Sequence, residues 1–473
     1  PFFFFTPTRA SEIASCLVGS EMCIRDSDIR GIVETELTPK IVKLIGRAIG
    51  SESIEKGERG VVVGRDGRLS GPELSESLIS GLVESGCHVV NIGMVPSPVV
   101  YFATHTKAAS SGVMITGSHN PPEYNGLKIT IAGETLSAER IQALYSRIIE
   151  NNFSNGHGTS TSINIDQDYI DIIKSDIKLE KKLKVVIDCG NGVAGNIAPK
   201  LFEALGVKVS KLFCLVDGRF PNHHPDPSKP ENLEDLIQEV IETESDLGLA
   251  FDGDGDRLGV IDNKGKVIWA DHQMMLYAKD VISRNKGAKV IYDVKCTSLL
   301  PKLISESGGE PILSRTGHSF IKKKLKETNA ELAGEMSGHI FFKERWYGFD
   351  DALYTGARLI EIISKNDKTC SEIFDEFPVN LSTPEININF EKYGQQYDAM
   401  DTLSNNIDFP DASVNTIDGF RVDYEDCWGL VRPSNTTPCL VLRFEGNSEA
   451  ELNKIKERFK KWLEVSGIPT DNL

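Results

Sequence analysis

Short apolar runs alternate with amphipathic stretches through most of the chain, and one order of elements appears three times. The run at 59–66 (RGVVVGRD) precedes a helical stretch at 72–84, then Gly86 and a second apolar run at 88–92. The same order returns at 184–213 and at 289–313, beginning with KVVID and KVIYD. An apolar strand, a helix and a second strand in this order are typical of a parallel sheet covered by helices.

The spacing of the three copies favours three similar domains over one large sheet. The copies begin at Val61, Val185 and Val290, which are 124 and 105 residues apart. A polar segment rich in Gly and Ser, 151–162, predicts a linker after the first copy. The C-terminal part lacks the repeat and combines a strand at 439–444 with an amphipathic helix at 448–465, which predicts a smaller α+β domain. We therefore predict an α/β fold with three βαβ domains built on mixed or parallel sheets, at 28–155, 160–263 and 264–378, and a C-terminal domain at 379–473.

The first 27 residues differ in character from the rest of the chain. An aromatic run at 2–5 leads into a stretch with no clean helical or strand period, and LVGSEMCIRDS at 17–27 resembles translated cloning or sequencing debris. A secretory signal would need basic residues before a longer apolar core. We expect residues 1–27 to be a non-native or atypical segment.

Composition and charge exclude several classes of protein. The 473 residues carry 52 Lys and Arg against 69 Asp and Glu, a net charge of −17, which argues against a nucleic-acid partner. No apolar stretch approaches the roughly 20 residues that cross a bilayer. The 9 cysteines show no paired spacing, so they indicate reduced thiols in the cytoplasm and not a disulfide framework or zinc site.

Three acidic residues at alternate positions form the strongest candidate metal site. Asp252, Asp254 and Asp256 follow the apolar run 247–251, and Arg257 follows them. Hard oxygen ligands at this spacing suit Mg²⁺. An EF-hand loop is excluded, because Arg257 stands at its required glycine and Asn263 at its bidentate glutamate. A solvated acidic turn is the alternative, but three neighbouring like charges repel unless a cation is present.

A rigid turn after the apolar segment 112–115 presents a candidate nucleophile. In TGSHNPP (116–122), two prolines fix the loop that carries Ser118 and His119, and Lys128 lies downstream. A lone Ser-His pair is weak evidence, and the G-x-S-x-G frame of a nucleophile elbow is absent. The nearby GRDGR (64–68) resembles a phosphate loop, but we interpret it as a structural strand-to-helix turn.

Two further turns carry groups suited to a phosphorylated sugar. GEMSGH (334–339) places Glu335, Ser337 and His339 together, which suits sugar hydroxyls. RPSNTTP (432–438) combines a guanidinium, three hydroxyls and an amide, which suits a phosphate. Taken alone, each is as well explained by an ordinary capped turn.

The four motifs TGSHNPP, DGDGDR, GEMSGH and RPSNTTP occur in this order, one in each predicted domain. Together they resemble the α-D-phosphohexomutase superfamily, and GEMSGH and SNTTP resemble its bacterial phosphomannomutase/phosphoglucomutase branch. The resemblance runs from about Asp28 to the C-terminal helix. It implies four domains in a heart-shaped arrangement around a central cleft. One position departs from the family, since Ser27 stands where a Tyr is usual.

The resemblance also implies residue roles. Ser118 would be the phosphoserine, and its phosphate would join Asp252, Asp254 and Asp256 in holding Mg²⁺, with Arg257 beside the metal. Arg30, His119 and Lys128 would lie near the transferred phosphoryl group. The residues expected to contact the sugar or its second phosphate are Lys295, His318, Glu335, Ser337, His339, Arg432, Ser434, Asn435, Thr436 and Thr437.

The expected reaction is reversible phosphoryl transfer between C1 and C6 of glucose and mannose phosphates. Phospho-Ser118 would donate its phosphate to form a hexose 1,6-bisphosphate, which would also act as activator, and would take back the other phosphate. Such a transfer requires that the negative charge of the phosphoryl group is neutralised and that its oxygens are held in line. The general base stays open among Lys128, His318 and His339. A phosphoglucosamine mutase, a Mg²⁺-dependent sugar phosphatase and a non-catalytic sugar-phosphate binder are the alternatives, and we expect a monomer or weak dimer.

Overall fold

The computed structural model describes residues 28–107, 109–434 and 437–473. The chain divides into two compact units. The first holds the described residues up to Ala270 together with Ser337–Ile373, and the second holds Asp271–Met336 and Phe374–Leu473. The prediction for residues 1–27 lies outside the described residues. Among the helices described, none is both long enough and apolar enough to cross a membrane.

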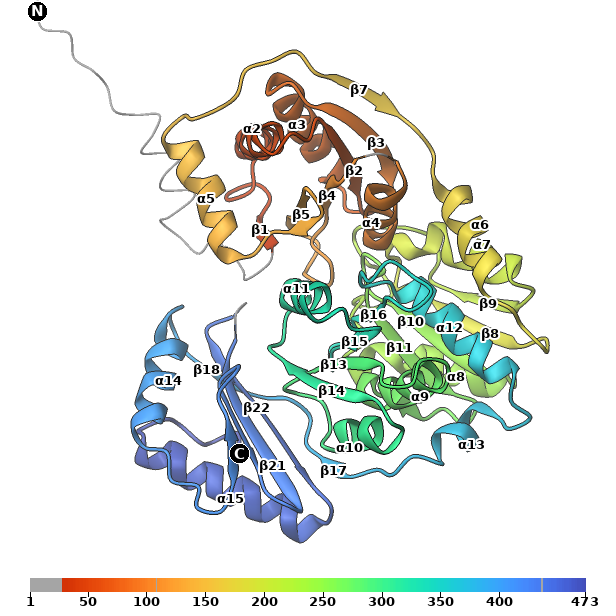
Figure 1. Cartoon of the computed structure of the whole chain (residues 1–473), viewed down its shortest axis with the longest axis vertical. Helices are drawn as coiled ribbons and strands as arrows, with labels where there is room; N and C mark the ends of the chain where they lie inside the picture. The colour runs from red at the N-terminus through yellow and green to blue at the C-terminus, as the bar shows by residue number, and fades with distance from the viewer. Residues whose placement is uncertain (1–27, 108, 435–436) are drawn as a thin grey trace, which may run out of the picture. The chain divides into compact units, whose positions relative to one another are not determined.

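The first sheet of unit one mixes parallel and antiparallel strands (Figure 1). Its order is β1-β5-β4-β2-β3-β7, and β6 pairs with β5. β4, β2, β3 and β7 run parallel, whereas β5 runs antiparallel to both β4 and β1. The strands are β1 (Asp28–Ile32), β2 (Gly60–Arg65), β3 (His88–Met94), β4 (Ser111–Ile115), β5 (Tyr124–Ile131), β6 (Glu134–Thr135) and β7 (Thr159–Ser162).

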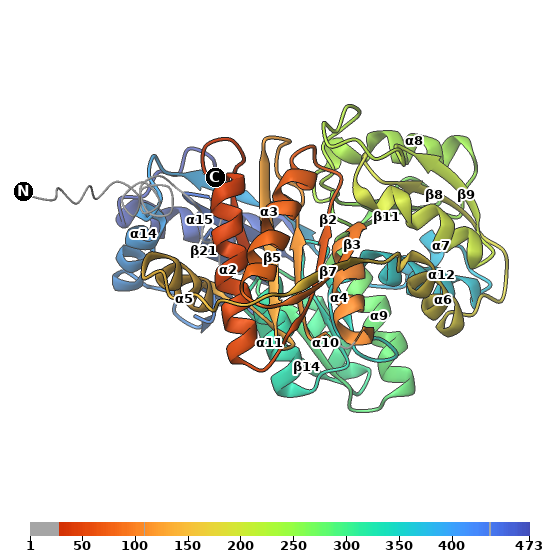
Figure 2. The same cartoon turned by 90° about the horizontal axis from the view of Figure 1, so that it is seen from above.

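Helices cover both faces of this sheet. α2 (Pro39–Glu55) and α3 (Gly71–Glu84) lie side by side on one face (Figures 1 and 2). Two glycines allow this close approach, because a Cβ at Gly46 would lie 2.5 Å from the Leu78 oxygen and one at Gly81 would lie 2.1 Å from the Lys43 oxygen. α4 (Ser97–Thr106) covers the other face, and α5 (Ala138–Ile149) packs with α2.

The predicted linker 151–162 is partly wrong. Its last four residues form β7 and pair in parallel with His88–Asn91 of β3, although all four are exposed. The sequence pattern missed this strand because Thr159–Ser162 has no apolar alternation, and its backbone is ordered by the open edge of β3.

The second sheet of unit one has the order β12-β11-β10-β8-β9. β8 is parallel to both β9 and β10, and β10 turns back into the antiparallel β11. The acidic motif is the connection between β10 and β11. The strands are β8 (Lys184–Asp188), β9 (Lys208–Leu212), β10 (Leu247–Phe251), β11 (Leu258–Asp262) and β12 (Val267–Ile268). The remaining elements of unit one are α6 (Asp166–Asp176), η1 (Val193–Asn196), α7 (Ala198–Ala204), η2 (Pro230–Leu233), α8 (Glu234–Glu242), β16 (Ile340–Phe342) and α12 (Ala352–Ser364).

Unit two contains the third parallel arrangement and the C-terminal sheet. β13 (Lys289–Asp293) is parallel to β14 (Glu310–Ser314) and to β15 (Leu332–Gly334). The helices of this part are α9 (Ala270–Arg284), α10 (Leu299–Glu306) and α11 (His318–Thr328), and α13 (Cys370–Phe374) ends at the boundary between the units.

The C-terminal sheet is antiparallel and carries two helices. Its order is β17-β22-β21-β20-β19, with β18 paired to β22. α14 and α15 contribute Leu403, Ile455 and Phe459 to one apolar core with this sheet. Ser448 caps α15 by accepting a hydrogen bond from the Glu451 amide, 3.3 Å away. The elements are β17 (Leu381–Ser382), β18 (Ile386–Asn389), α14 (Gln395–Asn405), β19 (Ser413–Asn415), β20 (Phe420–Asp423), β21 (Cys427–Pro433), β22 (Cys439–Gly446) and α15 (Glu449–Val465). The α/β fold class predicted from the repeated pattern is confirmed, and the sheets of unit one are mixed.

Candidate active site

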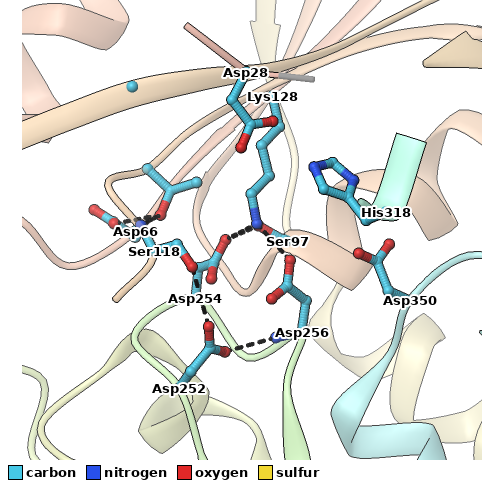
Figure 3. Close-up of polar contacts among 12 residues, drawn as sticks. Asp28, Asp66, Ser97, Ser118, Lys128, Asp252, Asp254, Asp256, His318 and Asp350 are labelled. Atoms are coloured by element: carbon cyan, nitrogen blue, oxygen red, sulfur yellow. Dashed lines mark hydrogen bonds and ion pairs between the residues drawn. The ribbon is translucent and has the colours of Figure 1, made fainter. Parts of the chain in front are cut away.

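Ser118 lies in a tight turn that directly follows β4. Its φ of 48° is in the left-handed region, which a residue other than glycine adopts only when its surroundings hold it there. The Ser118 amide donates to Thr116 Oγ1 at 2.7 Å, and the side chain is buried. Ser118 Oγ lies 3.1 Å from Asp252 Oδ2 (Figure 3) and 3.2 Å from His119 Nδ1. The turn therefore aims the hydroxyl at the acidic motif.

Arg68 holds this turn through backbone carbonyl groups. Its Nη1 donates to the carbonyl oxygens of Pro121 and Tyr124 at 2.6 and 2.8 Å. Its Nη2 donates to the carbonyl oxygens of Ser118 and Asn120 at 2.9 and 2.6 Å. A buried guanidinium with donors fixed in one plane is suited to hold four carbonyl groups at once. We define these contacts as the Arg68 clamp.

Asp66 orients the Arg68 clamp and the start of the same turn. Its Oδ2 accepts from Arg68 Nε at 3.2 Å and from Thr116 Oγ1 at 2.7 Å. Sequence reasoning interpreted GRDGR as a structural turn and missed its contact with the Ser118 loop. The two segments are fifty residues apart, and no periodicity links them.

Replacing Arg68 by lysine is expected to lower kcat about 100-fold, because a single ammonium cannot hold four carbonyls and a displaced nucleophile reacts slowly. Steady-state kinetics and thermal unfolding would be measured together. Arg65→Lys is the matched control, since Arg65 Nη1 donates to the Asp66 carbonyl and takes no part in the clamp. An Arg68→Lys protein that folds and turns over like the wild type would contradict the clamp's role.

The acidic motif gathers three buried carboxylates at the β10–β11 connection. Oxygen atoms of Asp252, Asp254 and Asp256 all lie within 4.8 Å of one another. Asp252 Oδ1 accepts from the amides of Asp256 and Arg257 at 3.0 and 3.1 Å, which closes the turn. Asp254 Oδ1 and Asp256 Oδ1 are buried and accept no hydrogen bond within the described part of the chain. Buried carboxylate oxygens that accept no hydrogen bond are suited to bind a divalent cation such as Mg²⁺, which prefers hard oxygen ligands.

Lys128 is the cation that the chain itself provides to this cluster. Its Nζ lies 2.6 Å from Asp254 Oδ2 and also contacts Asp256 Oδ2 (Figure 3). Burial alone would lower the pKa of Lys128, but these two carboxylates hold it well above its usual value. Burial would likewise raise the pKa of Asp254, yet Lys128 holds it well below its usual range. Lys128 is therefore a fixed positive charge.

Asp252 shows that the nearby positive charges of Lys128 and Arg257 do not balance the cluster. Burial, and then the charges of Asp256 and Asp254, raise the pKa of Asp252 well above its usual value. A carboxyl group in this state favours its protonated form, and a divalent cation would reverse that preference. The cluster is thus electrostatically suited to bind a metal ion.

Arg257 and His339 form a bonded pair beside the acidic motif. Arg257 Nε donates to His339 Nε2 at 3.0 Å. His339 Nδ1 lies 3.1 Å from Asp350 Oδ2. Because Nε2 accepts a hydrogen bond, the ring proton belongs on Nδ1, where it faces Asp350.

The strand pair β1–β5 brings one further predicted residue, Arg30, to the Ser118 loop. Arg30 contacts the Asn120 side chain through Nη1 and Asp28 through Nη2 at 3.0 Å. The register places Asp28 opposite Lys128. Burial, and then Arg257 and Arg30, hold the pKa of His119 well below its usual value, so its ring is neutral.

A second group of predicted residues lies in unit two. Lys295 Nζ pairs with Glu385 Oε1 at 2.7 Å, and Arg443 Nη1 holds the Lys295 carbonyl at 2.6 Å. Arg432 Nε pairs with Asp418 Oδ2 at 2.9 Å. Glu335 Oε1 accepts from the Gly317 amide at 2.6 Å, at the start of α11.

Ser434 and Thr437 contact each other through their hydroxyls. Ser434 Oγ lies 2.9 Å from Thr437 Oγ1 and accepts from the Thr437 amide at 3.2 Å. Asn435 and Thr436 lie outside the described residues.

The predicted residues thus fall into two sets. Unit one brings together Arg30, Ser118, His119, Lys128, Asp252, Asp254, Asp256, Arg257 and His339, and also contains Ser337. Unit two contains Lys295, His318, Glu335, Arg432, Ser434 and Thr437. Sequence reasoning missed Arg68, Asp66, Asp28, Ser97 and Asp350. Ser97 donates to Asp254 Oδ2 at 2.5 Å from the first turn of α4, and no local motif marks it.

Comparisons with known proteins agree along most of the chain. Models of phosphoglucomutase/phosphomannomutase α/β/α domains I, II and III match residues 22–155, 167–265 and 269–380, and the model of the C-terminal domain matches 385–461. A phosphomannomutase/phosphoglucomutase of Pseudomonas aeruginosa is 56% identical over 447 residues, covering 94% of this chain and 96% of that protein. A phosphoglucomutase of Neisseria gonorrhoeae is 51% identical, covering 92% and 95%. The crystal structure of a phosphoglucomutase/phosphomannomutase family protein from Burkholderia thailandensis superimposes with a TM-score of 0.90 at 48% identity, covering 95% of this chain and 98% of that one.

Proposed function

Because the chain belongs to the phosphoglucomutase/phosphomannomutase family, we propose that it is an isomerase that moves a phosphoryl group between C1 and C6 of glucose and mannose phosphates. Phospho-Ser118 donates its phosphate to the sugar phosphate, and the hexose 1,6-bisphosphate so formed returns its other phosphate to Ser118. Added bisphosphate acts as the activator, since it rephosphorylates Ser118. Relatives that are named for both sugars, as well as one named for glucose alone, support this substrate class.

The observation that carries the proposal is the position of the Ser118 hydroxyl. It lies 3.1 Å from a carboxylate of the acidic motif. Lys128 joins two other carboxylates of that motif. Phosphoryl transfer needs a nucleophile, a fixed cation and a cluster suited to a metal ion close together in one site.

Asp252, Asp254 and Asp256 would hold Mg²⁺ together with the Ser118 phosphate. The ion would neutralise charge on the transferred group. Arg257 is held by its hydrogen bond to His339, so its guanidinium would lie beside the same phosphate. Lys128 stays protonated, and His339 Nε2 already accepts a hydrogen bond from Arg257, so His318 is the candidate that we favour for the general base.

The residues of unit two would bind the rest of the substrate. Arg432, Ser434, Asn435, Thr436 and Thr437 would grip the phosphate that is not transferred, with Lys295 and His318 toward the sugar. Glu335 and Ser337 would bind sugar hydroxyls. The predicted boundaries of the four domains belong to the proposal, as does action in the cytoplasm as a monomer or weak dimer. Free thiols at all seven described cysteines support a reducing compartment.

One assay tests the proposal. The protein is given glucose 1-phosphate, Mg²⁺ and a trace of glucose 1,6-bisphosphate, and products are separated. Glucose 6-phosphate is the expected product. Release of free phosphate would identify a phosphatase, and an unchanged substrate would identify a binder, and either result would overturn the proposal.

We expect glucose 1-phosphate and mannose 1-phosphate to be used with kcat/KM values within about tenfold of each other. The two sugars differ only at C2, and Glu335 is expected to bind O3 and O4, which they share. Glu335→Gln should therefore weaken both substrates equally. Steady-state kinetics with both sugars is the measurement, and Glu310→Gln, at an exposed position of β14, is the control. A loss confined to one sugar would show that C2 is recognised.

A further inference from the structure

Two cysteines meet at the ends of neighbouring strands in the second sheet of unit one. Cys189 follows β8 and Cys214 follows β9, and these strands run in parallel (Figure 1). The two Sγ atoms are 3.6 Å apart. A disulfide bond needs about 2 Å between its sulfurs, so a small movement of the side chains would join them.

The two thiols differ in exposure, as a reactive pair requires. Cys189 is fully buried, whereas Cys214 is the one cysteine among those described that is partly exposed. The hydrogen bond that joins the two thiols lowers the pKa of Cys214, which favours its thiolate. Burial raises the pKa of Cys189, and it raises the pKa of Cys296 and Cys370 as well. An oxidant therefore reaches Cys214 first, and Cys189 is already in contact with it.

The segment after Cys189 supports the acidic motif by its backbone. The Val193 amide donates to the Gly253 carbonyl at 3.1 Å. Gly192 lies so close to Gly253 that a Cβ at position 192 would be 2.9 Å from the Gly253 carbonyl oxygen. Gly253 separates Asp252 from Asp254, so a shift of this segment would be felt by two of the carboxylates.

We propose that Cys189 and Cys214 form an oxidation site for hydrogen peroxide, and that the resulting disulfide weakens metal binding at the acidic motif. The Cys214 thiolate attacks one peroxide oxygen, the O–O bond breaks, and hydroxide leaves and is protonated to water. The Cys189 thiol then attacks the sulfenic sulfur of Cys214. The S–S bond forms, the S–O bond breaks, and a second water leaves with the Cys189 proton. The two thiols are oxidised by two electrons and the peroxide is reduced.

The test treats the full-length protein with hydrogen peroxide and maps its peptides without reduction. We expect a peptide pair linked through Cys189 and Cys214, lighter by two hydrogens, which dithiothreitol restores. Cys214→Ser should remove the linked pair, and Cys427→Ser, a buried cysteine distant in the sequence, should leave it intact. A linked pair of other cysteines, or sulfonic acid at Cys214 without any link, would overturn the site.

The second part of the test is calorimetric titration of Mg²⁺ into reduced and oxidised protein. We expect the oxidised form to bind on the order of tenfold more weakly, as for other supports of a metal site. The oxidised Cys214→Ser protein should bind like the reduced wild type. Equal affinity in both wild-type forms would overturn the coupling to the metal. Absence of Mg²⁺ binding in the reduced protein would instead count against the proposed function, while the mapped disulfide would stand.

Discussion

Ser118→Ala is expected to lower mutase turnover by at least about 10⁴-fold, because no other group in the site replaces a covalent nucleophile. The wild-type protein should carry, at least in part, the mass of one added phosphate, and the variant should carry none. Alanine at this position meets the same φ of 48° as serine, so the fold should be retained. Intact-mass measurement and steady-state kinetics together give the result.

The control for this variant is Ser137→Ala, which removes a partly exposed hydroxyl that makes no capping hydrogen bond to α5. It should keep both the phosphate and the activity. Phosphate retained on Ser118→Ala would mean that another residue carries it. Full turnover in that variant would exclude Ser118 as the nucleophile.

Asp254→Asn is expected to reduce Mg²⁺-dependent turnover on the order of 1,000-fold, because it removes a charged ligand from the metal cluster. Asparagine keeps the size of the side chain, and Lys128 keeps its contact with Asp256, so no buried charge is left without a partner. We therefore expect the protein to remain folded. Turnover measured against Mg²⁺ concentration, with calorimetric titration of the metal, checks both statements.

Asp235→Asn, at an exposed position on α8 in the same sheet domain, is the matched charge control. Its Mg²⁺ dependence should be that of the wild type. Activity of Asp254→Asn that survives in excess chelator would show that the carboxylates serve no metal.

The predictable part of the fold was the part built from strong local patterns. KVVID and KVIYD place apolar side chains on both faces of a strand, and the structure has strands with those bounds at β8 and β13. The helix at 448–465 was marked by its apolar stripe, and the structure begins it one residue later, at Glu449, with Ser448 as its N-cap. β7 was not predictable in this way, because Thr159–Ser162 is polar and becomes a strand only through the edge of β3.

The candidate site divides along the same line. The alternating acids of DGDGDR and the two prolines of TGSHNPP reveal their chemistry within a few residues. Arg68 donates to the carbonyl of Ser118, which lies fifty residues away in the sequence. Asp350 contacts His339 from the far side of β16 in the sequence. Contacts of this kind depend on which strand ends share a sheet edge, and a single sequence holds no pattern for them.

The Arg68 clamp has a consequence for how the catalytic turn can vary. Every bond from its Nη atoms ends on a carbonyl oxygen, a group that all amino acids possess. The conformation of the loop therefore depends on its main-chain atoms, which Arg68 binds. The side chains of the loop remain available to contact the reactants. Substitutions at 119 and 120 can then retune the chemistry without dismantling the turn, whereas a single change at 68 removes the template on which all such variants depend.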